Sequence, residues 1–401
     1  KQKDKNKVDP ETNNGNPMLS PLETLFEFDT SVNINDGNPM LSPLETLFEF
    51  DTSVNICHSG TNQQLKEKDN NKVWPPSLIS ILQQTMATPC FHPSKPLFEF
   101  DMSVEAAEKN YMILMHKFGG DLHEALRAQQ GSPLQYGSEF KPVSILAPIF
   151  ENHPTWNKMM TLLTEGSTWP LSPIVEHDRL LDIDDALAFG NHKGANQQPE
   201  LLRKLINDDV TRGFALPFPL YKIKKIPGVL IAPLNIQLQK TINERGEIIP
   251  KNRMTHDQSW KWQSGTSVNS RVDEEQLMPC YFGQAMKRII NWAVAARKKY
   301  PNIRILATKL DIKAAFRRCH LNASTAIQTC TLLPELRLAL MMLRLTFGGA
   351  PCPSEFGAIS ETICDLINAI LQHDDWDPLT LFAETAQANV PPKETFEDNA
   401  P

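Results

Sequence analysis

The sequence predicts an α+β protein in which helices pack on an antiparallel sheet, preceded by a disordered region that contains repeats. Three observations predict this class. Strand-like runs flank short turns at two places in the C-terminal half. Several segments carry apolar residues at helical spacing. The first hundred residues are rich in Asn, Lys, Pro, Ser and Asp, a composition typical of disordered chain.

The length of 401 residues allows two or three domains, and the 31 prolines favour some unpacked chain. We divide the sequence into five regions. The regions are 1–108, mostly disordered; 109–219, mixed and mainly helical; 220–280, a hairpin region; 281–380, helices and strands; and 381–401, a disordered tail.

Charge is distributed unevenly along the chain. Residues Leu201 to Cys330 hold 22 Lys and Arg against 9 Asp and Glu, a net charge of +13, whereas the rest hold 18 against 38, a net charge of −20. A basic middle on an acidic chain suggests a polyanionic partner, and a solvated charged surface is the alternative.

The sequence excludes several protein classes. The seven cysteines include no C-x-x-C pair and no His at zinc spacing, so we expect reduced thiols in an intracellular protein of the cytoplasm or nucleus. No apolar run approaches the ~18 residues of a membrane span. The opening KQKDKNK lacks the apolar stretch of a signal peptide. We therefore expect no membrane partner.

A direct repeat lies near the N-terminus. GNPMLSPLETLFEFDTSVNI occurs at Gly15–Ile34 and again at Gly37–Ile56, and LFEFDMSV follows at Leu97–Val104. Two perfect copies indicate a recent duplication rather than a stacked array, which needs three or more units. LFEFD is either a short docking motif or a segment without function.

Regular elements are predicted from residue 108 onward. Helical spacing favours helices at 108–129, 153–163, 200–212, 282–299 and 354–372, the last with Ser354 as its N-cap candidate. Residues 228–259 predict a β-hairpin around the turn Asn243–Gly246. Strands are expected at 303–310, 326–333 and 337–345, the last two around Pro334–Glu335.

The strand at 303–310 runs into a carboxylate, Asp311, followed five residues later by Phe316 and two arginines. A carboxylate at a strand's end beside a basic segment suits Mg²⁺, which prefers oxygen ligands and substrate phosphates. The alternative is that Asp311 caps a short helix over Lys313–Cys319.

Three segments together resemble the reverse transcriptases of retrotransposons, including those of the tyrosine-recombinase type. LDIKAAFRR resembles motif A, and FGGAPCPSEF resembles motif B with Cys352 in its small-residue position. KNRMTHD resembles the strand of the fingers, where Arg253 is followed by Asp257. The segments occur in the family's order, and SGTSVNS adds to the likeness. The resemblance covers about 220–372 and implies the fingers and a partial palm of a right-hand polymerase.

The resemblance implies roles for individual residues. Asp311 would be a catalytic, metal-binding carboxylate for Mg²⁺ or Mn²⁺, and the Ile312 carbonyl could add a ligand. Phe316 would lie under the sugar of the incoming dNTP and exclude a 2′-hydroxyl. Arg253 would contact the triphosphate, whereas Lys251 is either a second phosphate ligand or a solvated lysine.

Further residues would shape the template pocket. Phe347 and Gly348 would form its wall, Gly348 by letting the backbone approach closely. Arg317 and Arg318 would contact phosphates of an RNA or DNA template–primer, or they are surface charges.

The family's second acidic motif has no clear counterpart after the last predicted helix. HDDWDP at 373–378 lacks a preceding apolar strand, and Pro378 favours a turn. We therefore expect a chain that stops before this motif and is inactive by itself. The alternatives are a non-catalytic remnant that binds nucleic acid, and an interaction protein that acts through its LFEFD repeats.

Overall fold

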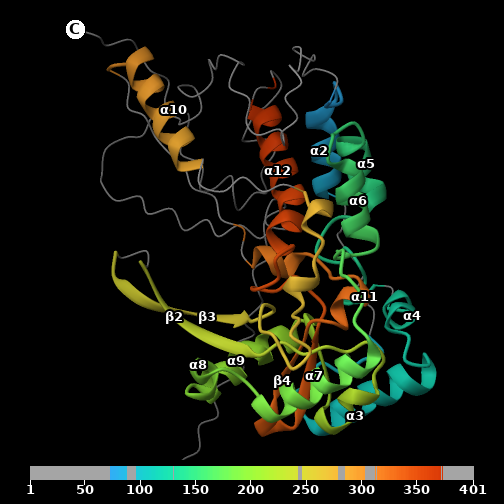
Figure 1. Cartoon of the computed structure of the whole chain (residues 1–401). Coiled ribbons are helices and arrows are strands. Elements are labelled where there is room, and N and C mark those ends of the chain that lie inside the picture. Colours follow the sequence, from blue (N-terminus) through green and yellow to red (C-terminus); the bar gives the residue numbers. More distant parts are fainter. Residues whose placement is uncertain are drawn as a thin grey trace, which may run out of the picture.

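A computed structural model describes residues 73–87, 96–129, 131–242, 246–278, 285–302, 312, 314–371 and 373. The described residues form a mixed α+β structure with a three-stranded and a two-stranded antiparallel sheet (Figure 1). The α+β class predicted from the sequence is confirmed at this level.

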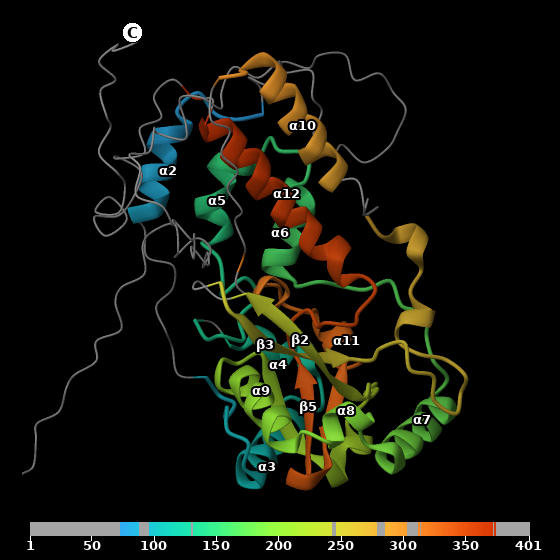
Figure 2. The same ribbon diagram turned by 90° about the vertical axis from the view of Figure 1, so that its left-hand side faces the viewer.

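The helices lie in two groups (Figure 1 and Figure 2). α2, α5, α6 and α12 run together at one end of the molecule, and α3, α7, α8 and α9 lie around the strands at the other. The helices are α2 (Leu78–Ala87), α3 (Val104–Met112), α4 (Leu122–Arg127), α5 (Val143–Phe150), α6 (Trp156–Thr164), α7 (Glu176–Phe189), α8 (Lys193–Asn196), α9 (Pro199–Thr211), α10 (Ala285–Lys299), α11 (Ala323–Ala326) and α12 (Cys352–Leu371).

Shorter helical turns connect these elements. They are the π-helical turn η2 (Ile113–Lys117) and the 3-10 turns η3 (Leu220–Lys225), η4 (Asn269–Arg271), η5 (Glu274–Gln276), η6 (Ala315–Arg318) and η7 (Pro334–Leu336).

The larger sheet has the order β1 (Ala215–Pro219), β5 (Leu338–Met342), β4 (Cys330–Leu333), and all of its residues are buried. Alternate residues of a strand point to opposite faces. In β5, Ala339 and Met341 accordingly join one apolar cluster, whereas Leu338, Leu340 and Met342 join another. The sheet is therefore covered on both faces, and β4 and β5 confirm the strand pair predicted around Pro334.

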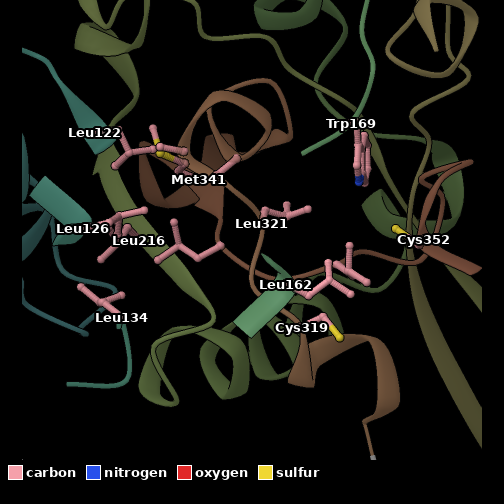
Figure 3. Close-up of a cluster of buried hydrophobic side chains, with 14 of the residues drawn as sticks. Leu122, Leu126, Leu134, Leu162, Trp169, Leu216, Cys319, Leu321, Met341 and Cys352 are labelled. Carbon is pink, nitrogen blue, oxygen red and sulfur yellow. The ribbon is translucent and has the colours of Figure 1, made fainter. Parts of the chain in front are cut away.

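Each face of this sheet has its own cover. α9 contributes Leu202, Ile206 and Val210 to the smaller cluster. The larger cluster combines residues of α2, α4, α5, α6, α7 and α12 with the other face of the sheet. Figure 3 shows part of it, with Leu122 of α4 beside Met341 of β5.

Strand β1 was missed by the sequence analysis, which predicted mainly helices over 109–219. Its sequence, ALPFP, holds two prolines, and proline lacks the N–H that a central strand needs. Among the described strands, β1 pairs only with β5 and forms an edge of this sheet, where proline is tolerated.

The predicted hairpin is present as β2 (Leu234–Ile242) and β3 (Ile248–His256), and it projects from the body in Figure 1. Its register pairs Leu234 with His256 and Ile242 with Ile248. At its base Leu234 and Ile236 are buried, so the hairpin is anchored at one end only. Residues 243–245 of the predicted turn lie outside the described residues.

Two segments of the region expected to be disordered belong to the fold. Residues 73–87 and 96–108 are described, and Leu78 and Phe98 are almost fully buried. The boundary predicted at 108 is wrong for these segments because their apolar side chains complete the core. Residues 1–72 and 88–95 lie outside the described residues.

Two helix predictions also need correction. α10 forms, but Ile289, Ile290 and Val294 are more than half exposed, so its apolar side is not packed on the sheet as expected. α12 begins at Cys352, so Ser354 lies in its first turn and is not its N-cap. The strand predicted at 303–310 and the tail 381–401 lie outside the described residues.

Candidate nucleotide-binding site

Three segments that are far apart in the sequence converge beside the base of the hairpin. The guanidinium carbon of Arg253 lies 5.6 Å from the centre of the Phe347 ring. The Phe347 ring lies 5.2 Å from that of Phe316. The structure therefore brings together one residue from each of the segments KNRMTHD, LDIKAAFRR and FGGAPCPSEF.

Arg253 reaches this position from strand β3, where it pairs with Gln237. The side-chain period of two places Lys251 and Arg253 on the same face of the hairpin. Both residues are exposed. The opposite face carries Lys240 and Leu238, whereas Ile249 shares the face of Lys251 and Arg253. Arg253 is the residue of this mainly polar face that reaches Phe347.

Phe316 is held by the 3-10 turn η6. Ala314 before the turn adopts a left-handed conformation with φ of 53°, which turns the chain sharply. The Phe316 ring is half-buried and meets Phe356 of α12 edge-on at 5.9 Å. Phe347 remains 46% exposed, so the pair offers an aromatic surface to solvent beside the Arg253 cation.

Gly348 is required at its position for two reasons. Its φ of +136° is one that residues with a side chain rarely adopt, and a Cβ built there would lie 1.7 Å from the carbonyl oxygen of His256. The neighbouring Phe347 carbonyl accepts a 2.7 Å hydrogen bond from the His256 amide. The glycine loop is therefore fixed directly against the end of β3.

A residue to which the sequence analysis gave no role, Asn269, fixes the other side of this loop. Its amide nitrogen donates to the Gly348 carbonyl at 2.7 Å, and its amide oxygen accepts from the Ala350 amide at 2.8 Å. Asn269 belongs to the segment SGTSVNS, whose likeness to the family was the only signal for it. The side chain holds the loop in the shape that presents Phe347.

Two titratable groups under the loop are held neutral. His256 is 1% exposed and neither ring nitrogen has a hydrogen-bond partner. Burial, reinforced by the positive charge of Arg317, lowers the pKa of His256 well below its usual value. Burial raises the pKa of the Cys352 thiol to about 12. Both groups therefore serve packing rather than proton transfer near neutral pH.

Arg317 and Arg318 point into the protein and form ion pairs. Arg317 donates to the Asp209 carboxylate at 2.8 Å and to the Leu345 carbonyl at 2.9 Å. Arg318 lies 2.9 Å from a carboxylate oxygen of Glu139. Burial raises the pKa of Asp209, and the attraction of Arg317 opposes that rise. These pairs occupy both guanidinium groups, which the sequence analysis had placed on phosphates or on the surface.

The predicted metal ligands are only partly within the described residues. Ile312 is half-buried and packs against the larger core cluster, whereas Asp311 lies outside the described residues. Asp374 and Asp375, in the segment HDDWDP that the sequence analysis interpreted as a turn, also lie outside them. Within the described ranges, no group of three or more His, Cys, Asp and Glu residues is arranged to hold a metal ion. The described side chains alone therefore do not form a metal centre.

No helix in the described part of the chain has both the length and the hydropathy needed to cross a membrane. Comparisons with protein-family models, with curated proteins and with solved structures found no match to this chain.

Proposed function

We propose that the chain is a fragment of a retrotransposon reverse transcriptase and contributes the fingers and a partial palm. One observation carries the proposal: Arg253 and Phe316 each lie within contact range of Phe347, and the three residues come from the three family-like segments. Arg253 and Phe316 are 63 residues apart in the sequence, and Phe316 and Phe347 are 31 residues apart, so only the fold brings these segments together.

The arrangement suits an incoming deoxynucleotide. Arg253 presents an exposed planar cation, which can form paired hydrogen bonds to phosphate oxygens. Lys251, on the same face of the hairpin, adds a second positive charge. Phe316 and Phe347 provide the apolar surface, and we assign to Phe316 the exclusion of a 2′-hydroxyl.

The proposed reaction is the addition of dNTPs to a primer on an RNA or DNA template. In the proposal, Asp311 and the Ile312 carbonyl bind Mg²⁺ or Mn²⁺. Bound there, such a metal would supply activation of the attacking oxygen and neutralisation of the charge on the leaving phosphates. The cytoplasm or nucleus is the compartment that this substrate class implies.

Arg317 and Arg318 are not part of the proposed nucleic-acid surface. Their ion pairs with Asp209 and Glu139 would have to break before either could contact a phosphate. Breaking a buried pair leaves an uncompensated charge, which costs about 3–5 kcal/mol. Lys251 and Arg253 are better placed because both are exposed.

A non-catalytic remnant that binds nucleic acid is the second candidate. The observation in its favour is that no second acidic motif is recognised after α12 in the sequence. Two-metal transfer needs carboxylates from more than one segment, so we expect no polymerase activity from this chain alone.

Primer extension separates the two candidates. A version extended past Pro401 to include a second acidic motif should incorporate dNTPs. Asp311→Asn should abolish incorporation and leave duplex binding near normal, and Phe316→Ala should admit ribonucleotides. The control Lys240→Ala, on the other face of the hairpin, should change neither. Undiminished incorporation by Asp311→Asn would exclude the proposed enzyme.

A further inference from the structure

The segment LFEFDMSV at Leu97–Val104 shows how the repeated motif is bound. Phe98 is 2% exposed within the larger core cluster. Phe100 packs against both clusters, and the space for its ring depends on Gly213, where a Cβ would lie 3.3 Å from it. The two phenylalanines thus anchor the segment on the body of the protein.

Two buried amide side chains bind the backbone of this segment. Gln129 accepts from the Leu97 amide at 3.0 Å. Asn110 accepts from the Glu99 amide at 2.8 Å and donates to the Glu99 carbonyl at 2.9 Å. Asn110 and Gln129 are almost fully buried, so their hydrogen bonds to this segment are shielded from water. We call these contacts the LFEF groove, formed by Asn110, Gln129, Gly213 and the core around Phe98.

The remaining residues of the motif also have roles. Asp101 accepts a 2.8 Å hydrogen bond from the Ser103 amide, and Ser103 caps α3 by accepting from Ala106 at 3.2 Å. The segments Leu25–Val32 and Leu47–Val54 both read LFEFDTSV and differ from Leu97–Val104 only by Thr in place of Met102. The motif residues that the groove contacts, Phe98, Glu99 and Phe100, are therefore identical to their counterparts in the two copies.

We propose that the LFEF groove binds the two upstream copies, which substitute for Leu97–Val104 within the same chain. The second copy is joined to Leu97 by residues 55–96, and the cost of closing such a loop grows only slowly with its length. The tether keeps the copies at high effective concentration. Leu97–Val104 is favoured in the intact chain because it continues directly into α3.

Thermal unfolding of the full chain tests the substitution. Phe26→Ala with Phe48→Ala should leave the Tm unchanged. The triple variant, in which Phe26, Phe48 and Phe98 are all replaced by Ala, should lose roughly 10 °C in Tm. Phe98→Ala alone should lower the Tm by less than half of that amount. The control is Phe140→Ala, which removes another buried phenylalanine outside the repeat. It should lower the Tm by the same amount whether Phe26 and Phe48 are present or are replaced by Ala. Equal losses for Phe98→Ala and the triple variant would overturn the proposal.

A peptide supplies a second test that holds even if the triple variant does not fold alone. Leu22–Ile34 as a synthetic peptide should raise the Tm of the triple variant, or its recovery on refolding, and the same peptide with Phe26→Ala and Phe28→Ala should not. No difference between the peptides would contradict the groove's specificity. Light scattering should show that Phe98→Ala is monomeric at a concentration at which the wild type is also monomeric. A dimer of Phe98→Ala that depends on Phe26 and Phe48 would overturn the proposal that the copies bind within one chain.

Discussion

At the residue scale, Gly348 joins the proposed site to the hairpin. Its contact with the His256 carbonyl and its positive φ both exclude a side chain. Gly348→Ala should lower the free energy of unfolding by about 3 kcal/mol or more, because backbone on both sides must move. Urea unfolding measures this change.

The matched control for that variant is Gly265→Ala. Gly265 also has a positive φ, of +77°, but a Cβ there would meet nothing within 4 Å. It should cost only about 1–2 kcal/mol, the strain of a left-handed residue. Equal costs at the two glycines would show that the contact with His256 is not tight.

Two buried histidines predict how stability depends on pH. Burial lowers the pKa of His256 and of His320 well below 6.5, aided by Arg317 at the first and Arg344 at the second. Below pH 6.5 the unfolded chain binds protons that the folded chain does not, so stability falls as pH decreases. Each histidine contributes a slope of up to about 1.4 kcal/mol per pH unit in this range.

Unfolding free energies measured from pH 8 to pH 5 test this dependence. His256→Gln and His320→Gln should each reduce the slope of the unfolding free energy against pH below pH 6.5. The reduction should be up to about 1.4 kcal/mol per pH unit, the effect of one proton. Above pH 7 their slopes should coincide with that of the wild type. An unchanged slope in both variants would mean that these rings are protonated in the folded protein.

At the element scale, the sequence predicted those elements whose pattern is local. The β2–β3 hairpin and the β4–β5 pair were found because apolar runs flank a turn within a few residues. β1 was missed because Pro217 and Pro219 are unfavourable in a strand, and only its place at the sheet edge makes them acceptable. α10 was found by its spacing, but spacing does not say what covers Ile289 and Ile290.

For the candidate site too, the sequence predicted what a local pattern signals and missed what depends on distant contacts. The order of motifs in the sequence selected Arg253, Phe316 and Phe347 as candidates, and the fold places the first two beside Phe347. It could not identify the ion pairs of Arg317 and Arg318, whose partners lie 108 and 179 residues away. Asn269 was missed because its function is a loop contact that no composition or period signals.

At the scale of the whole molecule, the covered sheet supports the projecting hairpin. Both faces of β1, β5 and β4 are buried, whereas the hairpin is buried only at its base. A buried body with an exposed basic arm agrees with the charged ligand that we propose. The excess of basic residues in the middle of the sequence is partly neutralised, since Arg317 and Arg318 are paired.

The central claim is that Arg253, Phe316 and Phe347 bind an incoming deoxynucleotide. Its most direct test is the Kd of a fluorescent dNTP for this chain, measured with Mg²⁺ and a primer–template duplex, for wild type, Arg253→Ala and Lys240→Ala. Losing a charged hydrogen-bond donor costs about 1.5–3 kcal/mol, so Arg253→Ala should weaken binding by about tenfold or more, while Lys240→Ala should change it less than about twofold. Equal affinities for wild type and Arg253→Ala, or no measurable binding by wild type, would contradict the claim.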